Sequence, residues 1–201
     1  MLVFWKQKLV ILAVPKTGTT ALAQALGRSA DIVVNDPPEL KHAPVYRYNR
    51  FFRPMFEKAC GEDGMEIMAI MREPVSWLGS WYRYRQRNFL DGRLTSTKGL
   101  SFDAFVTEYM REDRKAFANV GSQAKFLEPR PNGTKVSYLF RYESSAPMIE
   151  FLESRLDREI DLPRVNVSAQ QDTPLSSTVH DRLRNHCSAD FALYQGLVDL
   201  G

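Results

Sequence analysis

Cysteine, net charge and long apolar runs are all scarce in this chain of 201 residues. The two cysteines, Cys60 and Cys187, are too few for a disulfide framework and stand in no metal-ligand spacing, so we expect free, buried thiols. A net charge of +3 does not indicate a nucleic-acid partner. No segment reaches the roughly 18 uncharged apolar residues that a membrane-spanning helix requires. These scarcities argue against a disulfide-stapled scaffold, a transmembrane protein and a strongly basic DNA-binding protein.

The composition is otherwise that of an ordinary globular protein. Apolar residues make up 44% of the chain and charged residues 25%, which is typical of a soluble protein. The length suits one domain, and we expect a single domain over residues 1–201. Residues 1–8 carry no secretory leader pattern, so we expect a cytoplasmic protein. Arginine supplies 18 of the 27 basic residues, and its guanidinium group suits phosphate or sulfate ligands.

Residues 9–26, LVILAVPKTGTTALAQAL, are the most informative stretch. The apolar run 9–14 is typical of a parallel strand covered on both faces, and Pro15 ends it. Gly18 permits a tight turn, after which the apolar spacing predicts a helix that stops at Gly27. Such a turn leaves backbone N–H groups unpaired and faces the positive end of the helix dipole. It therefore forms an anion site.

Lys16 adds a positive charge to this turn, and Thr19 and Thr20 can cap the helix. The nucleoside-triphosphate signature G-x-x-x-x-G-K-[ST] has its Lys directly after a Gly, whereas Lys16 stands two residues before Gly18. The order instead resembles the 5′-phosphosulfate-binding loop of the sulfotransferases that use 3′-phosphoadenosine 5′-phosphosulfate (PAPS). The residues that carry this resemblance are Pro15-Lys16-Thr17-Gly18-Thr19-Thr20.

A second strand-to-helix junction follows later in the chain. The run 66–71, EIMAIM, predicts a strand, and Pro74 is typical of the first turn of a helix. Arg72 at the strand end and Ser80 in the helix can then hold one anion. Glu73 stands where sulfotransferases usually have Asp or Asn, and we expect little effect from that change. The sulfotransferase 3′-phosphate motif R-x-P-x-x-x-x-x-S-x-Y is matched by Arg72, Pro74, Ser80 and Tyr82.

Two such motifs in this order describe a site for one bisphosphorylated nucleotide. The chain therefore resembles the PAPS-dependent sulfotransferases, in particular soluble, bacterial-type enzymes similar to carbohydrate sulfotransferases. The resemblance implies a P-loop-like, three-layer α/β/α fold with a mainly parallel sheet. Because both motifs must lie at one sheet edge, we expect strands 9–14 and 66–71 to be neighbours. The resemblance also implies that PAPS donates a sulfuryl group to a hydroxyl or amine of a small-molecule or carbohydrate acceptor, without a metal, and leaves as 3′-phosphoadenosine 5′-phosphate (PAP).

The same resemblance implies a role for each motif residue. Lys16 stabilises the charge that grows on the leaving 5′-phosphate. Arg72 and Ser80 bind the 3′-phosphate and so distinguish PAPS from ATP. The 5′-phosphosulfate is bound by the turn at Lys16, Thr17, Gly18, Thr19 and Thr20.

His42 is the candidate general base, because an imidazole titrates near neutral pH and can take a proton from an acceptor hydroxyl. Sulfotransferases place a His or a Glu shortly after the second strand, which we expect at 31–34, and Glu39 is the alternative base. The surrounding segment 39–53, ELKHAPVYRYNRFFR, predicts a long irregular connection at the ligand-binding edge of the sheet. Its basic and aromatic side chains make it a candidate acceptor wall.

The rest of the chain alternates further elements. Asn119–Gln123 resembles a segment near the reaction centre of some carbohydrate sulfotransferases, Tyr142-Glu143 resembles the family's YE after a strand, and Asn166 with Ser168 resembles an N-x-S segment near the nucleotide. We expect a loop at 91–99, a helix from Ser101, a helix at 114–127, a turn at 129–133, a strand at 136–140, a helix at 145–156, and a last helix at 176–195 that closes over the sheet.

Two other functions are compatible with these motifs. A P-loop nucleotide kinase or other phosphotransferase would share the fold, but it would depend on magnesium and prefer ATP. A catalytically silent relative would bind PAP and turn nothing over. Titration with PAP and with ATP plus magnesium separates the phosphotransferase from the other two.

Overall fold

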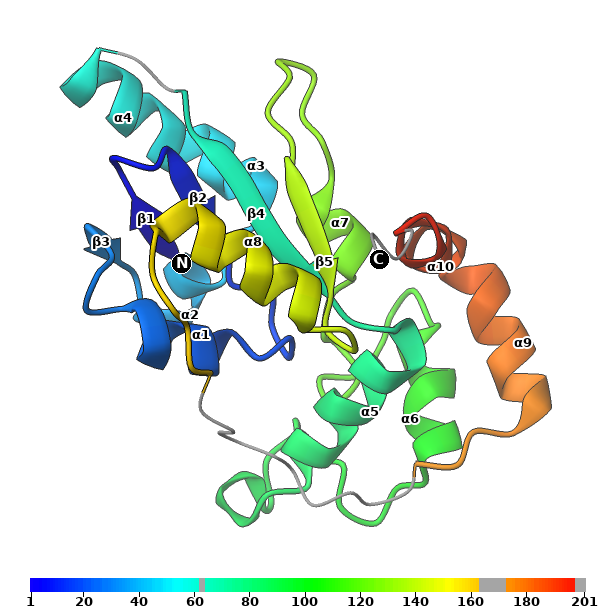
Figure 1. Ribbon diagram of the computed structural model, residues 1–201. Helices are drawn as coiled ribbons and strands as arrows, with labels where there is room; N and C mark the ends of the chain where they lie inside the picture. Colours follow the sequence, from blue (N-terminus) through cyan, green and yellow to red (C-terminus); the bar gives the residue numbers. More distant parts are fainter. Residues whose placement is uncertain (62–63, 163–172, 198–201) are drawn as a thin grey trace. The chain divides into compact units, whose positions relative to one another are not determined.

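The computed structural model describes residues 1–61, 64–162 and 173–197 and divides the chain into two compact units (Figure 1). Unit 1 comprises residues 1–72, 123–165 and 197–201, and unit 2 comprises 73–122 and 166–196. Each unit is therefore assembled from separate stretches of the sequence. We expected residues 1–201 to form a single domain, and whether the two units together form one stays a prediction.

Unit 1 contains a mixed five-stranded sheet in the order β3-β1-β2-β4-β5. Strand β2 pairs with β4 in parallel, as does β4 with β5, whereas β1 is antiparallel to both β2 and β3. The fold is thus α/β, and the expected neighbours β2 and β4 are confirmed. The strands are β1 (Leu2–Phe4), β2 (Leu9–Ile11), β3 (Ile32–Val33), β4 (Glu66–Met71) and β5 (Tyr138–Arg141).

Strand β1 makes the sheet mixed, and the sequence analysis missed it. Its three apolar residues are followed by a turn at residues 5–8, in which the Lys8 N–H donates to the Trp5 carbonyl at 3.1 Å. This hairpin returns the chain directly into β2, so β1 runs against its neighbour. A three-residue run is too short to reveal strand periodicity.

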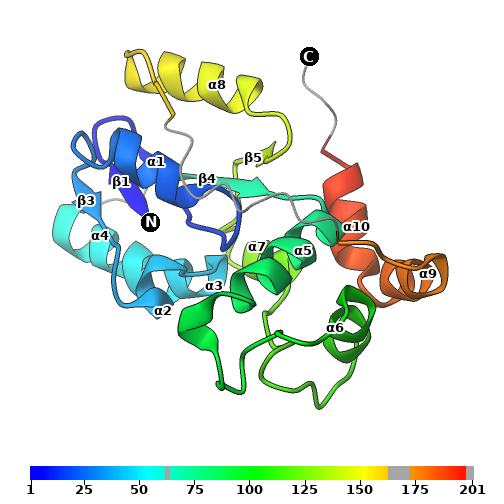
Figure 2. The ribbon, with the colours of Figure 1, turned by 90° about the horizontal axis from the view of Figure 1, so that it is seen from below.

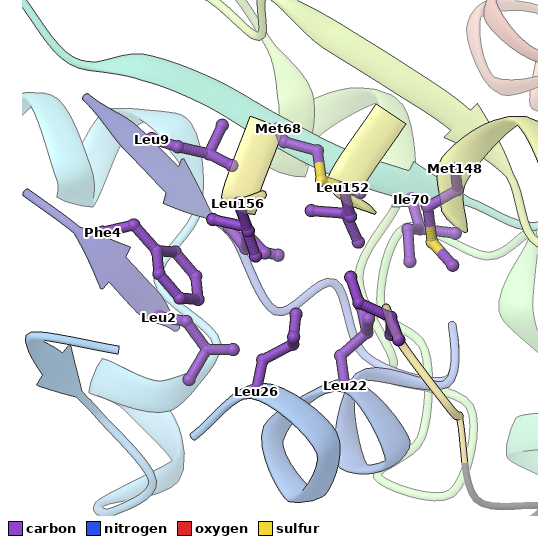
Figure 3. Close-up of a cluster of buried hydrophobic side chains, with 12 residues drawn as sticks. Leu2, Phe4, Leu9, Leu22, Leu26, Met68, Ile70, Met148, Leu152 and Leu156 are labelled. Atoms are coloured by element: carbon purple, nitrogen blue, oxygen red, sulfur yellow. The ribbon is translucent and has the colours of Figure 1, made fainter. Parts of the chain in front are cut away.

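One face of the sheet is covered by helices α1 (Thr19–Leu26) and α8 (Ala146–Leu156). Alternate strand residues point to this face, as the period of two requires. Figure 3 shows the strand side chains meeting leucines of both helices. On the opposite side of the sheet from α8 lie α3 (Val45–Arg47) and α4 (Arg53–Cys60) (Figure 2). The face covered by α1 and α8 is formed by Leu2, Phe4, Leu9, Ile11, Met68 and Ile70.

Residues 38–60 are helical except for a short break at 42–44, so the expectation of a long irregular connection at 39–53 is wrong. The segment contains α2 (Pro38–Lys41), α3 (Val45–Arg47), the π-helical turn η1 (Tyr48–Phe52) and α4 (Arg53–Cys60). Proline lacks an N–H and has a helical φ, so it starts a helix well. Pro38, Pro44 and Pro54 each stand at or next to such a start, whereas the sequence analysis treated the segment as a loop.

Unit 2 is helical and has its own core. The expected helix after Pro74 is confirmed as α5 (Pro74–Arg85), and the helix capped by Ser101 is confirmed as α6 (Phe102–Tyr109). The Ser101 side chain accepts from the Ala104 N–H. Other helical segments are the short η2 (Asn88–Leu90), α9 (Ser177–His186) and α10 (Ser188–Gln195) of unit 2, and α7 (Gln123–Leu127) of unit 1.

Two helix predictions need correction. Helix 114–127 is reduced to α7, because the buried Arg85 donates to the carbonyl oxygens of Ala116 and Asn119 and holds residues 114–122 as a loop. Helix 176–195 is broken into α9 and α10 at Cys187, which has φ −105° and ψ 31°. The buried apolar side chains of α9 and α10 belong to the core of unit 2, and the expectation that this part of the chain closes over the sheet stays a prediction.

The two cysteines differ in their exposure to solvent. Cys187 is buried, as expected, but Cys60 is exposed at the end of α4, so that half of the prediction is wrong. Both are free thiols.

Within the described residues, none of the helices combines the length and the apolar character needed to cross a bilayer.

Candidate functional site

The turn after β2 has the curled backbone that its sequence predicts. Lys16 has φ 66° and Gly18 has φ 75°, so two left-handed residues flank Thr17. Left-handed backbone costs a non-glycine residue about 1–2 kcal/mol, so Lys16 is held there by its surroundings. Thr17 is only 1% exposed, and its hydroxyl donates to the Val14 carbonyl at 2.9 Å. The hydroxyl of Thr17 therefore ties the turn to the end of the strand.

Helix α1 begins directly at this turn. Gly18 occupies the cap position and makes no side-chain cap bond, while Thr19 and Thr20 are the first two helical residues. The expectation that these threonines cap α1 is therefore wrong, because they stand one and two residues too late to do so. Without a side-chain cap, the first N–H groups of α1 are directed toward the turn and suit an anion.

Arg72 meets the same turn from the end of β4. Its Nη1 donates to the Lys16 carbonyl at 3.4 Å, and its guanidinium carbon lies 4.4 Å from the centre of the Tyr142 ring. A Cβ placed on Gly18 would stand 3.2 Å from Cε2 of that ring. The structure thus brings together Lys16, Gly18 and Arg72, as expected. Tyr142, whose role the sequence left open, lies beside Gly18 and Arg72.

His42 lies at the carboxyl end of β2 as well. Its Nδ1 is 2.7 Å from the Ala13 carbonyl oxygen. A carbonyl oxygen only accepts, so Nδ1 carries the hydrogen and, in the neutral ring, Nε2 keeps its lone pair. Burial lowers the pKa of His42, and the positive charges of Lys41 and Lys16 lower it further, while the bond to Ala13 opposes them. His42 is therefore neutral at pH 7, in the tautomer that can accept a proton.

Glu39, the alternative base, is exposed on α2. Its backbone carbonyl accepts from Arg47, but its carboxylate makes none of the contacts that tie His42 to the strand end. The geometry favours His42 over Glu39 as the base.

Ser80 lies on α5 in unit 2, whereas Arg72 is the last residue of the first stretch of unit 1. The two predicted 3′-phosphate ligands are therefore divided between the units, and their joint action stays a prediction. Glu73 caps α5, because its carboxylate accepts from the N–H groups of Val75 and Ser76 at 3.1 and 2.7 Å. Glu73 therefore serves the start of α5.

The candidate acceptor wall does not lie at one edge of the sheet. Its beginning, at His42, contacts the carboxyl end of β2. Farther along, Arg53 donates to Thr134, which precedes β5, and the Phe56 ring packs on Trp5, which precedes β2. Helix α4 therefore lies at the amino ends of these strands, away from the turn at Lys16 (Figure 1). Of His42, Arg53 and Phe56, only His42 therefore lies near the end of the sheet at which the Lys16 turn begins.

Three further sequence predictions concern Asn166 with Ser168, the segment at Gln123, and a metal site. Asn166 and Ser168 lie outside the described residues. Gln123 contacts Arg72, which the sequence analysis did not foresee, and the likeness of residues 119–123 to a segment near a reaction centre stays a prediction. Among residues 1–61, 64–162 and 173–197, no cluster of three or more His, Cys, Asp or Glu side chains is arranged to hold a metal ion.

Comparison of the chain with protein-family models, with curated proteins and with solved structures gave no significant match.

Proposed function

We propose that this chain is a PAPS-dependent sulfotransferase that transfers a sulfuryl group to a hydroxyl or amine of a small-molecule or carbohydrate acceptor. The proposal includes a P-loop-like sulfotransferase fold of three layers. One observation carries it: the Lys16 turn and Arg72 follow the adjacent parallel strands β2 and β4, and Arg72 reaches the Lys16 carbonyl. Two cationic side chains at one sheet edge suit a nucleotide with two separate phosphates.

The residues present fit this donor substrate. The backbone N–H groups of the turn at Gly18, Thr19 and Thr20 donate hydrogen bonds to the 5′-phosphate, and Thr17 holds the turn in shape. Lys16 stabilises the charge on the oxygen that leaves the sulfur. Arg72, with Ser80, binds the 3′-phosphate.

His42 supplies the other half of the reaction. Its Nε2 takes the proton of the acceptor hydroxyl as the acceptor oxygen bonds to sulfur and the bond from sulfur to the 5′-phosphate oxygen breaks. The negative charge leaves on PAP, and the proton stays on the imidazole until solvent removes it. The hydrogen bond from Nδ1 to Ala13 orients the ring during this transfer.

The proposal is tested by calorimetric titration with PAP and, in parallel, with ATP plus magnesium. PAP binding without ATP binding is the expected result, because Arg72 and Ser80 recognise a 3′-phosphate that ATP lacks. Binding of ATP with magnesium alone would overturn the proposal in favour of a phosphotransferase. PAP binding without transfer from PAPS to any of a panel of hydroxyl and amine acceptors would indicate the silent relative.

Two substitutions separate the roles within the site. Lys16→Ala is expected to abolish transfer and retain part of the PAP affinity, because Lys16 acts mainly on the leaving oxygen. Alanine keeps the Cβ, so the left-handed backbone of the turn is no more strained than before. Arg72→Ala is expected mainly to weaken PAP binding.

Exposed cations provide the matched controls for these substitutions. Lys58→Ala on α4 and Arg158→Ala beyond α8 should leave both PAP affinity and transfer unchanged. The opposite pattern would contradict these roles of Lys16 and Arg72. In that pattern Lys16→Ala loses PAP binding but keeps its transfer rate at saturating PAPS, and Arg72→Ala loses transfer but keeps PAP binding.

A further inference from the structure

The side chain of Gln123 holds the backbone of Arg72 at two points. Its Oε1 accepts from the Arg72 N–H at 2.9 Å, and its Nε2 donates to the Arg72 carbonyl oxygen at 2.8 Å. Gln123 is 1% exposed, so water does not compete for either bond. Arg72 lies one residue beyond the last register pair of β4, in which Met71 is paired with Arg141. The amide of Gln123 thus continues, for one residue, the pairing that a strand would provide.

This two-point contact limits how Arg72 can move. Rotation of the Arg72 peptide groups would break both bonds, and each would leave a buried polar group without its partner. With its backbone held, Arg72 projects its guanidinium from a defined position to the Lys16 carbonyl and to the Tyr142 ring. The site therefore carries a prepositioned cation, which loses little conformational freedom when an anion binds.

The contact also lies at a particular place in the chain. Arg72 is the last residue of the first stretch of unit 1, and Gln123 is the first residue of its next stretch. The residue at which the chain leaves unit 1 is therefore bonded to the residue at which it returns. The 50 residues of unit 2 between them, 73–122, begin and end at this contact.

We propose that Gln123 is a positioning residue that holds Arg72 for a 3′-phosphate and thereby sets the preference of the site for 3′-phosphorylated nucleotides. This inference rests on the proposed function, since it takes Arg72 as the 3′-phosphate ligand. Both of these bonds join Gln123 to the backbone of Arg72, so we expect its effect to fall on the 3′-phosphate that Arg72 binds.

The test compares dissociation constants for PAP and for adenosine 5′-monophosphate (AMP), which lacks the 3′-phosphate. Gln123→Met keeps the side-chain length and removes both hydrogen bonds. We expect the preference for PAP over AMP to fall about tenfold, because positioned hydrogen bonds to a charged group contribute about this factor or more to affinity. The affinity for AMP should stay within about twofold of the wild-type value. Gln24→Met, on the exposed side of α1, is the matched control and should change neither constant.

Two further variants keep the result interpretable. Gln123→Glu retains the acceptor for the Arg72 N–H and loses only the donor, so it should reduce the preference by a smaller factor. Adding Gln123→Met to Arg72→Ala should cause no further loss of preference, because the Arg that Gln123 positions is already gone.

The outcomes distinguish a failure of the role of Gln123 from a failure of the proposed function. An unchanged preference in both Gln123 variants overturns the inference, and so does an equal loss of PAP and AMP affinity, which is what a merely structural role would cause. A wild-type protein that does not prefer PAP to AMP instead overturns the proposed function.

Discussion

The ring of His42, the proposed base, is oriented by a backbone carbonyl. The Ala13 oxygen determines which nitrogen carries the hydrogen, and burial together with the charges of Lys41 and Lys16 keeps the ring neutral. The same Lys16 belongs to the turn that would bind the leaving phosphate. One cation can therefore lower the pKa of the base and stabilise the leaving group at the same site.

The lowered pKa predicts the pH dependence of transfer. The base must be unprotonated, so kcat/KM for PAPS-dependent transfer should stay high below pH 6.5, the ordinary pKa of histidine, and decline only at more acidic pH. His42→Gln should abolish this acidic limb together with most of the rate. His186→Gln, at an exposed position on α9, should leave the profile unchanged. An acidic limb centred above 6.5 would contradict this environment for His42.

The same shift predicts a pH-dependent stability. The folded protein binds the His42 proton less tightly than the unfolded chain does, so the free energy of unfolding should fall as the pH drops below 6.5 and through the lowered folded-state pKa. Urea denaturation at pH 7.5 and pH 5.5 measures this loss. In His42→Gln the loss should be smaller than in the wild type, and an equal loss in both proteins contradicts the prediction.

At the scale of elements, the turn between β2 and α1 depends on a glycine for two reasons. Gly18 has φ 75°, which disfavours any side chain, and an added Cβ would press on the Tyr142 ring at 3.2 Å. That ring also contacts the Arg72 guanidinium. A change at Gly18 therefore reaches both candidate phosphate ligands.

Gly18→Ala should destabilise the protein by about 1–2 kcal/mol and also weaken PAP binding. Gly133→Ala is the matched control, because Gly133 has φ 87° and a Cβ there meets nothing within 4 Å. The control should show a similar backbone cost in urea denaturation but unchanged PAP affinity by calorimetry. Equal PAP affinities in the two variants would show that Tyr142 and the turn are not coupled.

Helix α8 holds its face of the sheet through fully buried leucine side chains. Leu152 is completely buried among strand and α1 side chains (Figure 3). Leu152→Ala should lower the free energy of unfolding by about 2–5 kcal/mol, because it leaves a cavity that a packed layer cannot fill. Glu150→Ala, exposed on the same helix, should change it by less than about 0.5 kcal/mol. Urea denaturation of the two variants provides the comparison.

For the whole molecule, binding of the proposed nucleotide should raise stability by mass action. PAP at 100 times its dissociation constant should add about 2.7 kcal/mol to the free energy of unfolding, seen as a higher thermal midpoint. ATP plus magnesium at the same concentration should give little shift. Arg72→Ala should show a reduced shift with PAP, and a shift that ATP reproduces in full would contradict the proposed selectivity.

Local patterns in the sequence predicted the strands and helices that have a long, regular signal. The apolar run EIMAIM became β4, Pro74 began α5, and Ser101 capped α6. Prediction failed where a distant residue overrides the local pattern. Arg85 holds the carbonyls of Ala116 and Asn119 and prevents a helix there, and no periodicity within residues 114–127 reveals that contact.

Local sequence patterns were enough to predict the chemical groups of the candidate site: a lysine and a glycine after one strand, and an arginine after another. How those groups are oriented and bonded depends on contacts between distant parts of the chain. The contacts of His42 with Ala13, of Gln123 with Arg72 and of Arg72 with Lys16 span 29, 51 and 56 residues. Helix and strand periods describe neighbours a few residues apart, so only the folded chain determines which carbonyl orients the base and which amide holds the arginine.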